Sequence, residues 1–260
     1  MTSWILDLDG VVWRGLEPVP GSVEAISRLQ ADGHLVGYCT NNSSKTVSSY
    51  HHKLNSMGIE TPDIGGNSPI VTSAQAAAQL LSPGDRVLLC AGEGAAEAVT
   101  QRGCTICDQG AVDVVLVGYD DRFSYSRLAA ATTAVLGGAR LVATNNDPLY
   151  PTEFGPAPGA GSLLAAVEYA SGAQAEIAGK PFAPMASLVL QRFGDLGVFI
   201  GDSLATDGEL AKELGWQFGL VLSGNTSEAQ AESLVDQEWV GENLAALVQR
   251  HGGHRPAARS

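Results

Sequence analysis

The sequence predicts an α/β protein built on a doubly wound, Rossmann-like parallel sheet, and three observations carry this prediction. Short apolar runs alternate with helical patterns almost from end to end, which is typical of βαβ units and parallel sheets. Apolar residues make up 45% of the 260 residues, enough for a packed core in one large domain or two small ones. Glycine occurs 31 times, which suits many tight turns between strands and helices.

The expected elements follow one another in three series. In the first, a strand at residues 4–7 leads to a helix that is capped by Ser22 and ended by Gly33, and a strand at 35–40 follows. The second series has strands at 87–90, 112–117 and 141–144 and helices at 93–101, 124–136 and 162–171. The third has a strand near Ile177, a helix at 185–193, a strand at 198–200, a helix at 207–214 and a strand at 218–222. Residues 251–260 are polar and rich in Gly, Pro and Arg, so we expect a disordered tail.

The charge balance of the chain argues against nucleic acid and membrane partners. There are 15 basic and 28 acidic residues, a net charge of −13, which repels other polyanions. No apolar run approaches the ~20 residues that span a bilayer, and the first residues do not resemble a signal peptide. We therefore expect a cytoplasmic protein. Any anionic substrate then needs a local cation, either a side chain or a metal.

The four cysteines do not predict a disulfide framework. Cys39 and Cys90 lie in apolar runs, which favours small core residues. Cys104 and Cys107 form one CxxC, but a zinc site normally needs a second pair or nearby histidines, and neither occurs. A redox or metal role for this pair is therefore a weak hypothesis.

Two acidic residues lie where the first expected strand ends. Asp7 and Asp9 are two residues apart and are followed by Gly10, which lets the backbone turn sharply. In an open parallel sheet, ligands bind at the carboxyl ends of the strands, so both carboxylates could face one site. The alternative is an ordinary turn, because Asp and Gly are common turn residues.

Three further polar segments follow later strands. Thr40, Asn41 and Asn42 offer hydrogen-bond donors for phosphate oxygens, although a polar turn before a helix is the alternative. Lys180, framed by glycine and proline, is a positioned point charge suited to phosphate, although most lysines lie on the surface. Asp202 and Asp207 add oxygen ligands suited to magnesium, although acidic residues are also common in the first turn of a helix.

Taken together, these segments predict a phosphoryl-transfer site. Carboxylates of Asp7, Asp9, Asp202 and Asp207 at one sheet edge need compensating charge, which Mg²⁺ and Lys180 would supply. One carboxylate can attack phosphorus to form an acyl phosphate, and the second can protonate the leaving alkoxide and then activate water.

In that order, the four segments resemble the haloacid dehalogenase (HAD) superfamily. The matching motifs are DLDG at 7–10, TNN at 40–42, the lysine of GKP at 179–181 and GDSLATD at 201–207. The resemblance implies that Asp7 is the nucleophile and Asp9 the general acid/base, as in phosphatase members. It implies metal ligation by the carboxylates of Asp7 and Asp202 and the Asp9 carbonyl, with Asp207 as an outer or additional acid. Thr40 and Lys180 would bind the transferring phosphoryl group.

The long interval between TNN and GKP narrows the resemblance. It has its own α/β pattern and therefore predicts an inserted cap domain at residues 82–176, with the core formed by 1–81 and 177–250. The runs at 143–148 and 158–162 resemble the NagD-like, p-nitrophenyl phosphatase branch (HAD-IIA type). Ser203 departs from the arginine of many relatives, and Tyr150 lies where a cap residue would meet the leaving group, although packing alone also explains an aromatic residue there. Caps of this branch often pair, which favours a homodimer.

The leading hypothesis is a Mg²⁺-dependent phosphatase for a small phosphomonoester. The substrates that we consider are 2-phosphoglycolate, glycerol 3-phosphate, a nucleoside monophosphate and pyridoxal phosphate, with p-nitrophenyl phosphate as a test compound. One alternative is a phosphotransferase or mutase that uses the same aspartyl phosphate. Another is a catalytically silent protein that binds a phosphorylated ligand, since a fold by itself does not prove activity.

Overall fold

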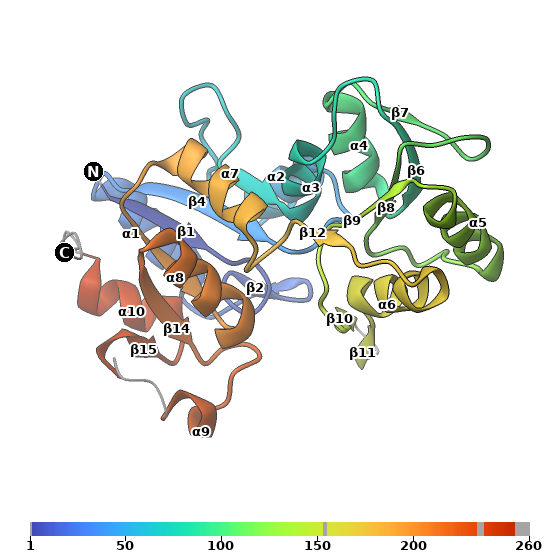
Figure 1. Ribbon diagram of the computed structural model, residues 1–260. Helices are drawn as coiled ribbons and strands as arrows, with labels where there is room; N and C mark the ends of the chain where they lie inside the picture. Colours follow the sequence, from blue (N-terminus) through green and yellow to red (C-terminus); the bar gives the residue numbers. More distant parts are fainter. Residues whose placement is uncertain (1, 153–154, 233–236, 253–260) are drawn as a thin grey trace. The chain divides into compact units, whose positions relative to one another are not determined.

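Parallel strands form two separate sheets, and the chain divides accordingly into two compact units. The structure, a computed structural model, describes residues 2–152, 155–232 and 237–252 (Figure 1). Unit 1 comprises Met1–Thr40, Tyr50–Val71 and Ala186–Ser260, and unit 2 comprises Asn41–Ser49 and Thr72–Met185. This division assigns residues 41–49, 72–81 and 177–185 to unit 2, whereas the sequence prediction assigned them to the core. The predicted domain boundaries stay a prediction.

Unit 1 is built on a six-stranded sheet with the order β15-β14-β13-β1-β4-β5. β1 pairs in parallel with both β4 and β13, and β14 pairs in parallel with β13 and β15. The strands are β1 (Ser3–Leu6), β4 (Leu35–Thr40), β5 (Ile70–Thr72), β13 (Gly197–Gly201), β14 (Gln217–Val221) and β15 (Val240–Gly241). Every residue of the central strands β1 and β13 is buried, which explains why each has an almost continuous apolar sequence.

Helices cover both faces of this sheet. The crossovers from β1 to β4 and from β13 to β14 run in opposite directions from the centre of the sheet, so α1 (Ser22–Ala31) and α8 (Glu209–Leu214) lie on opposite faces (Figure 1). The other elements are the hairpin β2 (Trp13–Arg14) and β3 (Glu17–Pro18), α2 (Val47–Ser56), α7 (Ala183–Phe193), the π-helical turn η1 (Leu204–Gly208), α9 (Glu228–Ala231), the 3₁₀ turn η2 (Gln237–Trp239) and α10 (Leu244–His251). α2 and α7 each begin in residues of unit 2 and continue into unit 1.

Unit 2 has a five-stranded sheet of its own, with the order β12-β9-β8-β6-β7. Its strands are β6 (Arg86–Cys90), β7 (Thr105–Ile106), β8 (Val114–Val117), β9 (Arg140–Ala143) and β12 (Glu176–Ile177), and all the neighbouring pairs are parallel. A separate antiparallel hairpin joins β10 (Leu149–Thr152) to β11 (Gly155–Pro158). Unit 2 is therefore a doubly wound α/β fold in its own right.

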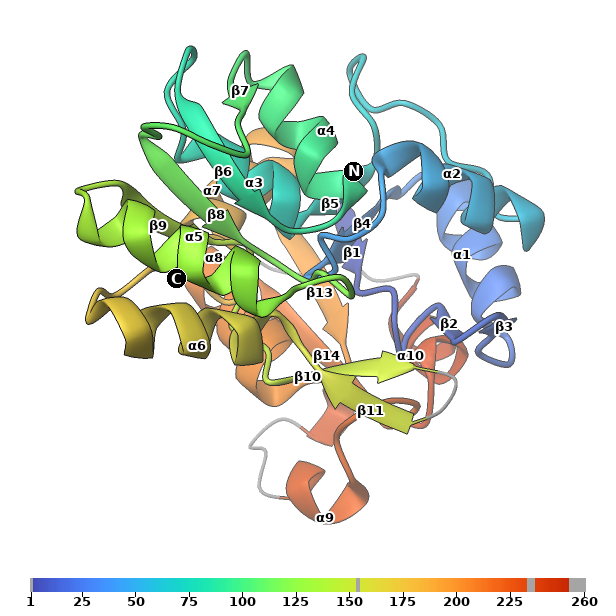
Figure 2. The same cartoon turned by 90° about the vertical axis from the view of Figure 1, so that its right-hand side faces the viewer.

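Two pairs of helices cover the sheet of unit 2. α5 (Tyr125–Leu136) and α6 (Ala160–Ser171) pack together on one face, and α3 (Ser73–Gln79) and α4 (Glu93–Gln101) pack together on the other (Figure 2). Side chains from β6, β8 and β9 form an apolar core with α5 and α6, and it includes Leu88, Val115, Leu141, Leu164 and Val167. The predicted fold class, parallel α/β with a large inserted α/β domain, is confirmed.

Most of the expected elements occur, with shifted ends. The strand at 35–40 and the helix at 93–101 have the predicted bounds, and Ser124 caps α5 by accepting a hydrogen bond from the Arg127 N–H. The cap predicted at Ser22 was wrong. Gly21 precedes the helix with φ of +78°, and the buried Ser22 hydroxyl donates instead to the Val12 carbonyl at 2.9 Å.

Two predictions near the end of the chain also need correction. The predicted helix at 207–214 is split, because η1 precedes a shorter α8. His251 does not belong to a disordered tail, because it ends α10 and its ring stacks on Trp239 with centroids 4.0 Å apart. Residues 253–260 lie outside the described part of the chain. Within the described residues, none of the helices has the length and apolar character needed to cross a membrane.

Candidate active site

Asp7 and Asp202 follow the carboxyl ends of two neighbouring strands. β1 and β13 pair with Leu6 opposite Ile200, and the Asp7 N–H donates to the Ile200 carbonyl at 2.8 Å. Parallel strands in this register bring the residues after them to the same edge of the unit 1 sheet. Both acids are buried, with exposed fractions of 8% for Asp7 and 2% for Asp202.

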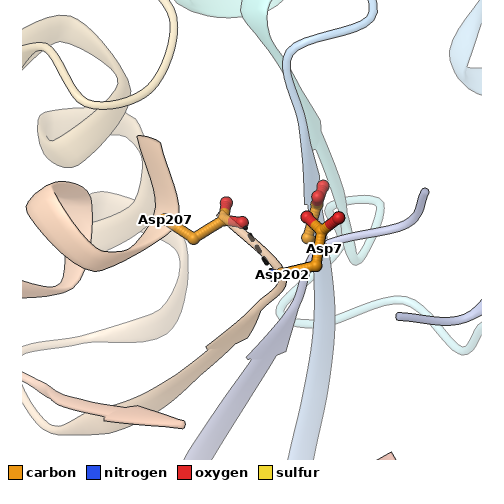
Figure 3. Close-up of side chains that lie close together, drawn as sticks. All are labelled: Asp7, Asp202 and Asp207. Atoms are coloured by element: carbon orange, nitrogen blue, oxygen red, sulfur yellow. Dashed lines mark hydrogen bonds between the residues drawn. The ribbon is translucent and has the colours of Figure 1, made fainter. Parts of the chain in front are cut away.

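A third acid completes a carboxylate cluster at this edge. One oxygen from each of Asp7, Asp202 and Asp207 lies within 4.8 Å of the other two (Figure 3). Buried carboxylates this close repel one another, so the cluster favours a compensating positive charge. Oxygen donors are the ligands that hard divalent cations such as Mg²⁺ prefer, so the residues fit such an ion. Among the described residues, no other group of three or more His, Cys, Asp or Glu side chains lies close enough together to hold a metal ion.

Asp202 is held by the loop after β14 and by close contacts with two glycines. The Asn225 N–H donates to Asp202 Oδ2, and the Thr226 hydroxyl donates to the Asp202 carbonyl, both at 2.6 Å. A Cβ at Gly224 would lie 1.8 Å from Asp202 Oδ2, and a Cβ at Gly10 would lie 2.5 Å from it. Gly10 also has φ of +83°, which other residues rarely adopt. The missing side chains leave room for the carboxylate.

Sequence reasoning missed the part of the site formed by Gly224, Asn225 and Thr226. The available signal was a Gly-Asn-Thr run shortly after an apolar strand, at the same edge as the predicted acids. Such a run ordinarily marks a turn, so its composition does not separate a turn that holds a carboxylate from one that does not.

Asp207 supports the loop that carries Asp202. Its Oδ2 accepts hydrogen bonds from the main-chain N–H groups of Asp202 and Ser203, both at 3.1 Å. Asp207 lies within η1, and a Cβ at Gly201 would lie only 2.2 Å from the Asp207 Cβ. The glycine thus allows the buried carboxylate to fold back on its own loop. The predicted role of Asp207 as a metal-site acid stays a prediction.

Asp9 has a different environment from the cluster. Its Oδ1 accepts a hydrogen bond from the Trp13 indole N–H at 2.9 Å. The Lys53 ammonium lies 3.7 Å from the centre of the Trp13 ring and donates to the Gly15 carbonyl at 2.8 Å. Burial lowers the pKa of Lys53, while the nearby Asp9 charge acts in the opposite direction. Trp13 and Lys53 were not predicted, because neither belongs to a recognisable motif.

The remaining predicted residues fall into both units. Thr40 ends β4, the neighbour of β1, and is 2% exposed, so it lies at the same sheet edge as Asp7. Asn41, Asn42, Tyr150 and Lys180 belong to unit 2. Lys180 is also 2% exposed, and its main chain is held by the Asn41 side chain. A surface lysine, the alternative from sequence, is therefore excluded.

Asn42 and Tyr150 contact each other within unit 2. Asn42 Nδ2 donates to the Tyr150 hydroxyl at 3.1 Å, and Asn42 Oδ1 accepts from the Ser44 N–H and hydroxyl at 2.9 and 2.7 Å. The Tyr150 ring stacks on Tyr119 with centroids 4.2 Å apart. These contacts fix the orientation of the tyrosine. Its predicted contact with a leaving group stays a prediction.

The CxxC motif does not form a pair of metal ligands. All four cysteines are free, and the Cys104 thiol donates to the Ser82 carbonyl at 3.3 Å while the Cys107 thiol lies 3.7 Å from the Thr105 carbonyl. Among the described residues, the possible metal-binding group contains no cysteine.

Fold and site together define an α/β enzyme core with a buried carboxylate cluster at the carboxyl edge of its parallel sheet. Residues 4–105 match the haloacid dehalogenase-like hydrolase family, and residues 177–247 match a second, HAD-hydrolase-like family. An acid sugar phosphatase of Staphylococcus saprophyticus is 36% identical over 182 residues, which cover 69% of each chain.

Solved structures agree with the sequence matches. The crystal structure of a glycerol phosphate phosphatase from Mycobacterium tuberculosis in complex with magnesium has a TM-score of 0.84 and 33% identity, and covers 94% of this chain and 75% of that one. A p-nitrophenyl phosphatase from Archaeoglobus fulgidus has a TM-score of 0.87 and 26% identity, and covers 95% and 98%. The chain belongs to the haloacid dehalogenase-like hydrolases, in the branch of NagD-like and p-nitrophenyl phosphatases. Its enzyme class is that of a phosphoric monoester hydrolase.

Proposed function

We propose that the chain hydrolyses a small-molecule phosphomonoester with Mg²⁺, through an aspartyl-phosphate intermediate on Asp7. The observation that carries this proposal is the buried cluster of Asp7, Asp202 and Asp207 oxygens within 4.8 Å of one another. Such a cluster is costly for folding unless a cation is bound, so its presence favours a function that uses the cation.

Three groups of this chain would hold the metal. These are the carboxylates of Asp7 and Asp202 and the main-chain carbonyl of Asp9, with Asp207 bracing the loop of Asp202. A bound divalent ion neutralises charge on the phosphoryl oxygens, which lowers the repulsion between an anionic nucleophile and an anionic substrate. The M. tuberculosis relative, whose structures contain calcium and magnesium, supports a divalent ion.

The side chains of Asp7 and Asp9 then divide the chemistry between them. An Asp7 oxygen attacks phosphorus, the bond from phosphorus to the ester oxygen breaks, and Asp9 gives its proton to the departing alkoxide. Water next attacks the same phosphorus, Asp9 takes a proton from it, and the bond from phosphorus to Asp7 breaks. The products are an alcohol and inorganic phosphate. The Trp13 indole N–H donates a hydrogen bond to Asp9 Oδ1, which leaves Asp9 Oδ2 to carry the transferred proton.

The substrate is a small, soluble phosphate ester. Two relatives are named acid sugar phosphatase and D-glycerol 3-phosphate phosphatase, and these names favour a polyol or sugar phosphate over a nucleotide or pyridoxal phosphate. Thr40 and Lys180 are the side chains that we propose to bind the transferring phosphoryl group. Phosphate release from a panel of about a hundred metabolite phosphates, ranked by kcat/KM, would identify the substrate because that ratio measures discrimination.

Replacing Asp7 tests the proposal directly. Asp7→Asn keeps the shape of the side chain but removes the nucleophilic charge, so we expect phosphate release to fall by at least about 10³-fold, with the fold intact by circular dichroism. EDTA should stop the wild-type activity, and added Mg²⁺ should restore it. The matched control is Asp32→Asn, which changes an exposed acid in unit 1 that pairs with Arg28 at 3.7 Å. Full activity in Asp7→Asn would exclude the aspartyl-phosphate route.

A further inference from the structure

One side chain, Asn41, holds both main-chain hydrogen-bonding groups of Lys180. Asn41 Oδ1 accepts from the Lys180 N–H at 2.7 Å, and Asn41 Nδ2 donates to the Lys180 carbonyl at 3.1 Å. These residues are 139 positions apart in the chain, so the contact joins two distant segments of unit 2. A two-point contact fixes the orientation of the Lys180 backbone more tightly than a single hydrogen bond does.

Asp147 determines which way the Asn41 amide faces. Asp147 Oδ2 accepts from Asn41 Nδ2 at 2.9 Å and from Asn145 Nδ2 at 2.6 Å. A carboxylate only accepts hydrogen bonds, so the amide nitrogen of Asn41 must face it, and the amide oxygen is left for the Lys180 N–H. The buried Thr144 hydroxyl donates to Asn145 Oδ1 at 2.9 Å, which orients Asn145 in turn.

The same contacts explain the glycine before Lys180. A Cβ at Gly179 would lie 2.6 Å from Asn41 Oδ1 and 2.5 Å from the Thr144 carbonyl oxygen. The Ser73 hydroxyl, which donates to the Asn41 carbonyl at 2.6 Å, holds the main chain of Asn41 itself. Gly179, Lys180 and the distant Asn41 are therefore packed together by the same set of contacts.

We propose that Asn41 is a positioning residue, which acts on the phosphoryl group through Lys180 and does not bind that group with its own side chain. The proposal rests on the function proposed above, in which Lys180 binds the transferring phosphoryl group. An amide nitrogen has two hydrogens, and in Asn41 they go to Asp147 and to the Lys180 carbonyl. The side chain has no N–H left for a phosphate oxygen, which revises the role that the sequence predicted for it.

A fixed backbone matters because a lysine side chain is long and flexible. Holding its main chain in place lowers the conformational entropy that is lost when the ammonium group binds phosphate. Removing the two hydrogen bonds from the Asn41 side chain should therefore weaken phosphate binding only as long as the Lys180 ammonium group is present.

A double-mutant cycle tests this dependence. The variants are Asn41→Ala, Lys180→Met and the two combined, and the measurement is calorimetric binding of inorganic phosphate with saturating Mg²⁺, together with kcat and KM for p-nitrophenyl phosphate. We expect Lys180→Met to weaken phosphate binding about 10- to 100-fold, since hydrogen bonds to charged groups carry about that much affinity. Asn41→Ala should weaken it about fivefold or more, and should weaken it no further in the Lys180→Met background.

Two results would overturn the proposal. Independent, additive effects of Asn41→Ala and Lys180→Met would show that Asn41 contacts phosphate itself, and unchanged phosphate binding in Lys180→Met would remove the premise. Calorimetry needs no turnover, so a wild-type protein that binds phosphate but hydrolyses no ester would count against the proposed function alone.

The segment that contains Asn145, Asn146 and Asp147 offers a matched control and a substitute variant. Asn146→Ala changes an exposed asparagine between Asn145 and Asp147 and should leave phosphate binding unchanged. If Asn41→Ala does not fold, Asn41→Asp combined with Asp147→Asn replaces it, because the exchange keeps an acceptor for the Lys180 N–H and an amide–carboxylate hydrogen bond. Its added effect should likewise vanish in the Lys180→Met background.

Discussion

At the scale of single residues, the acidic cluster depends on neighbouring glycines, which have no side chain to occupy the space of the carboxylates. Gly10 and Gly224 leave the space that the Asp202 carboxylate occupies, and Gly201 does the same for Asp207. Main-chain N–H groups then take part of the remaining hydrogen-bonding capacity of these acids, from Asn225 to Asp202 and from Ser203 to Asp207. Small residues and backbone donors thus fix the positions of carboxylates that repel one another.

Substituting Gly224 should damage the site more than the fold. In Gly224→Ala the new Cβ would meet Asp202 Oδ2 at 1.8 Å, so the carboxylate must move and lose the Asn225 hydrogen bond. We expect kcat/KM to fall at least about 10²-fold, because a displacement of about 1 Å at a catalytic group has that effect. Gly208→Ala is the control, since its Cβ would make ordinary contact with Phe218 at 3.4 Å. Equal activity in both variants would contradict the packing argument.

The cysteines should differ in reactivity. Burial raises the pKa of the Cys90 thiol to about 12, so Cys90 stays protonated at pH 8, and burial also raises the pKa of the Cys104 thiol, which disfavours its reactive thiolate. Cys107 is only half-buried. Iodoacetamide at pH 8 should therefore modify Cys107 first, as measured by mass spectrometry of peptides. Labelling of Cys90 at the same rate would show that its environment is not the one described.

The acids were predictable at this scale, whereas their partners were not. Asp7 and Asp202 follow apolar strands, and the strand-end rule for parallel sheets places such residues at one edge. Trp13 and Lys53, which surround Asp9, come from a hairpin and a helix whose packing no local pattern encodes. The role of Asn41 likewise depends on contacts more than a hundred residues away.

At the scale of elements, most strands and helices of the alternating α/β series were predictable, whereas several helices and most of the two-residue strands were not. Strands β2, β3, β7 and β15 have two residues each, too few for an alternation pattern to show, whereas the equally short β12 was expected near Ile177. Among the helices, α2, α9 and α10 were not predicted, and neither was α3, whose seven residues, SAQAAAQ, carry almost no periodic signal. Its start is instead defined by a capping box, in which the Thr72 side chain accepts from the Gln75 N–H and Gln75 reaches back to the Thr72 N–H.

Removing the capping box at the start of α3 should destabilise the protein measurably. Thr72→Ala removes the hydroxyl that satisfies a helix N–H, at a cost of about 1 kcal/mol in the free energy of unfolding. Urea unfolding followed by circular dichroism should show a lower midpoint with an unchanged slope. Ser227→Ala removes the same motif from the four-residue α9 and should cost less, because so short a helix contributes little. A larger effect at Ser227 would reverse this ranking.

At the scale of the whole molecule, the carboxylate cluster belongs to one unit alone. Asp7, Asp202 and Asp207 all lie in unit 1, which has its own sheet, whereas unit 2 has a separate sheet and a separate apolar core. A ligand that binds the folded form stabilises the unit that holds its ligating residues. Metal binding should therefore raise the stability of unit 1 more than that of unit 2.

Hydrogen exchange should reveal this inequality. At a Mg²⁺ concentration a hundred times the dissociation constant, binding adds about 2.7 kcal/mol to the stability of the unit that holds the ion. Amides of β1 and β13 should then exchange more slowly, while those of β8 and β9 keep their rates, as followed by mass spectrometry. The Asp202→Asn variant should lose the response. Uniform slowing in both sheets would argue against an ion held by unit 1 alone.

The indole of Trp13 has a practical consequence, since it touches Asp9 on one side and the Lys53 ammonium on its face. Tryptophan emission shifts when a charge beside the ring appears or vanishes. A change of ionisation at this aspartate would thus alter the intrinsic fluorescence of the protein, and comparison with Trp13→Phe would separate that signal from the other three tryptophans. The enzyme therefore has an intrinsic fluorescent reporter beside the carboxylate that we propose as its acid catalyst, so single turnovers could be followed by stopped flow without an attached dye.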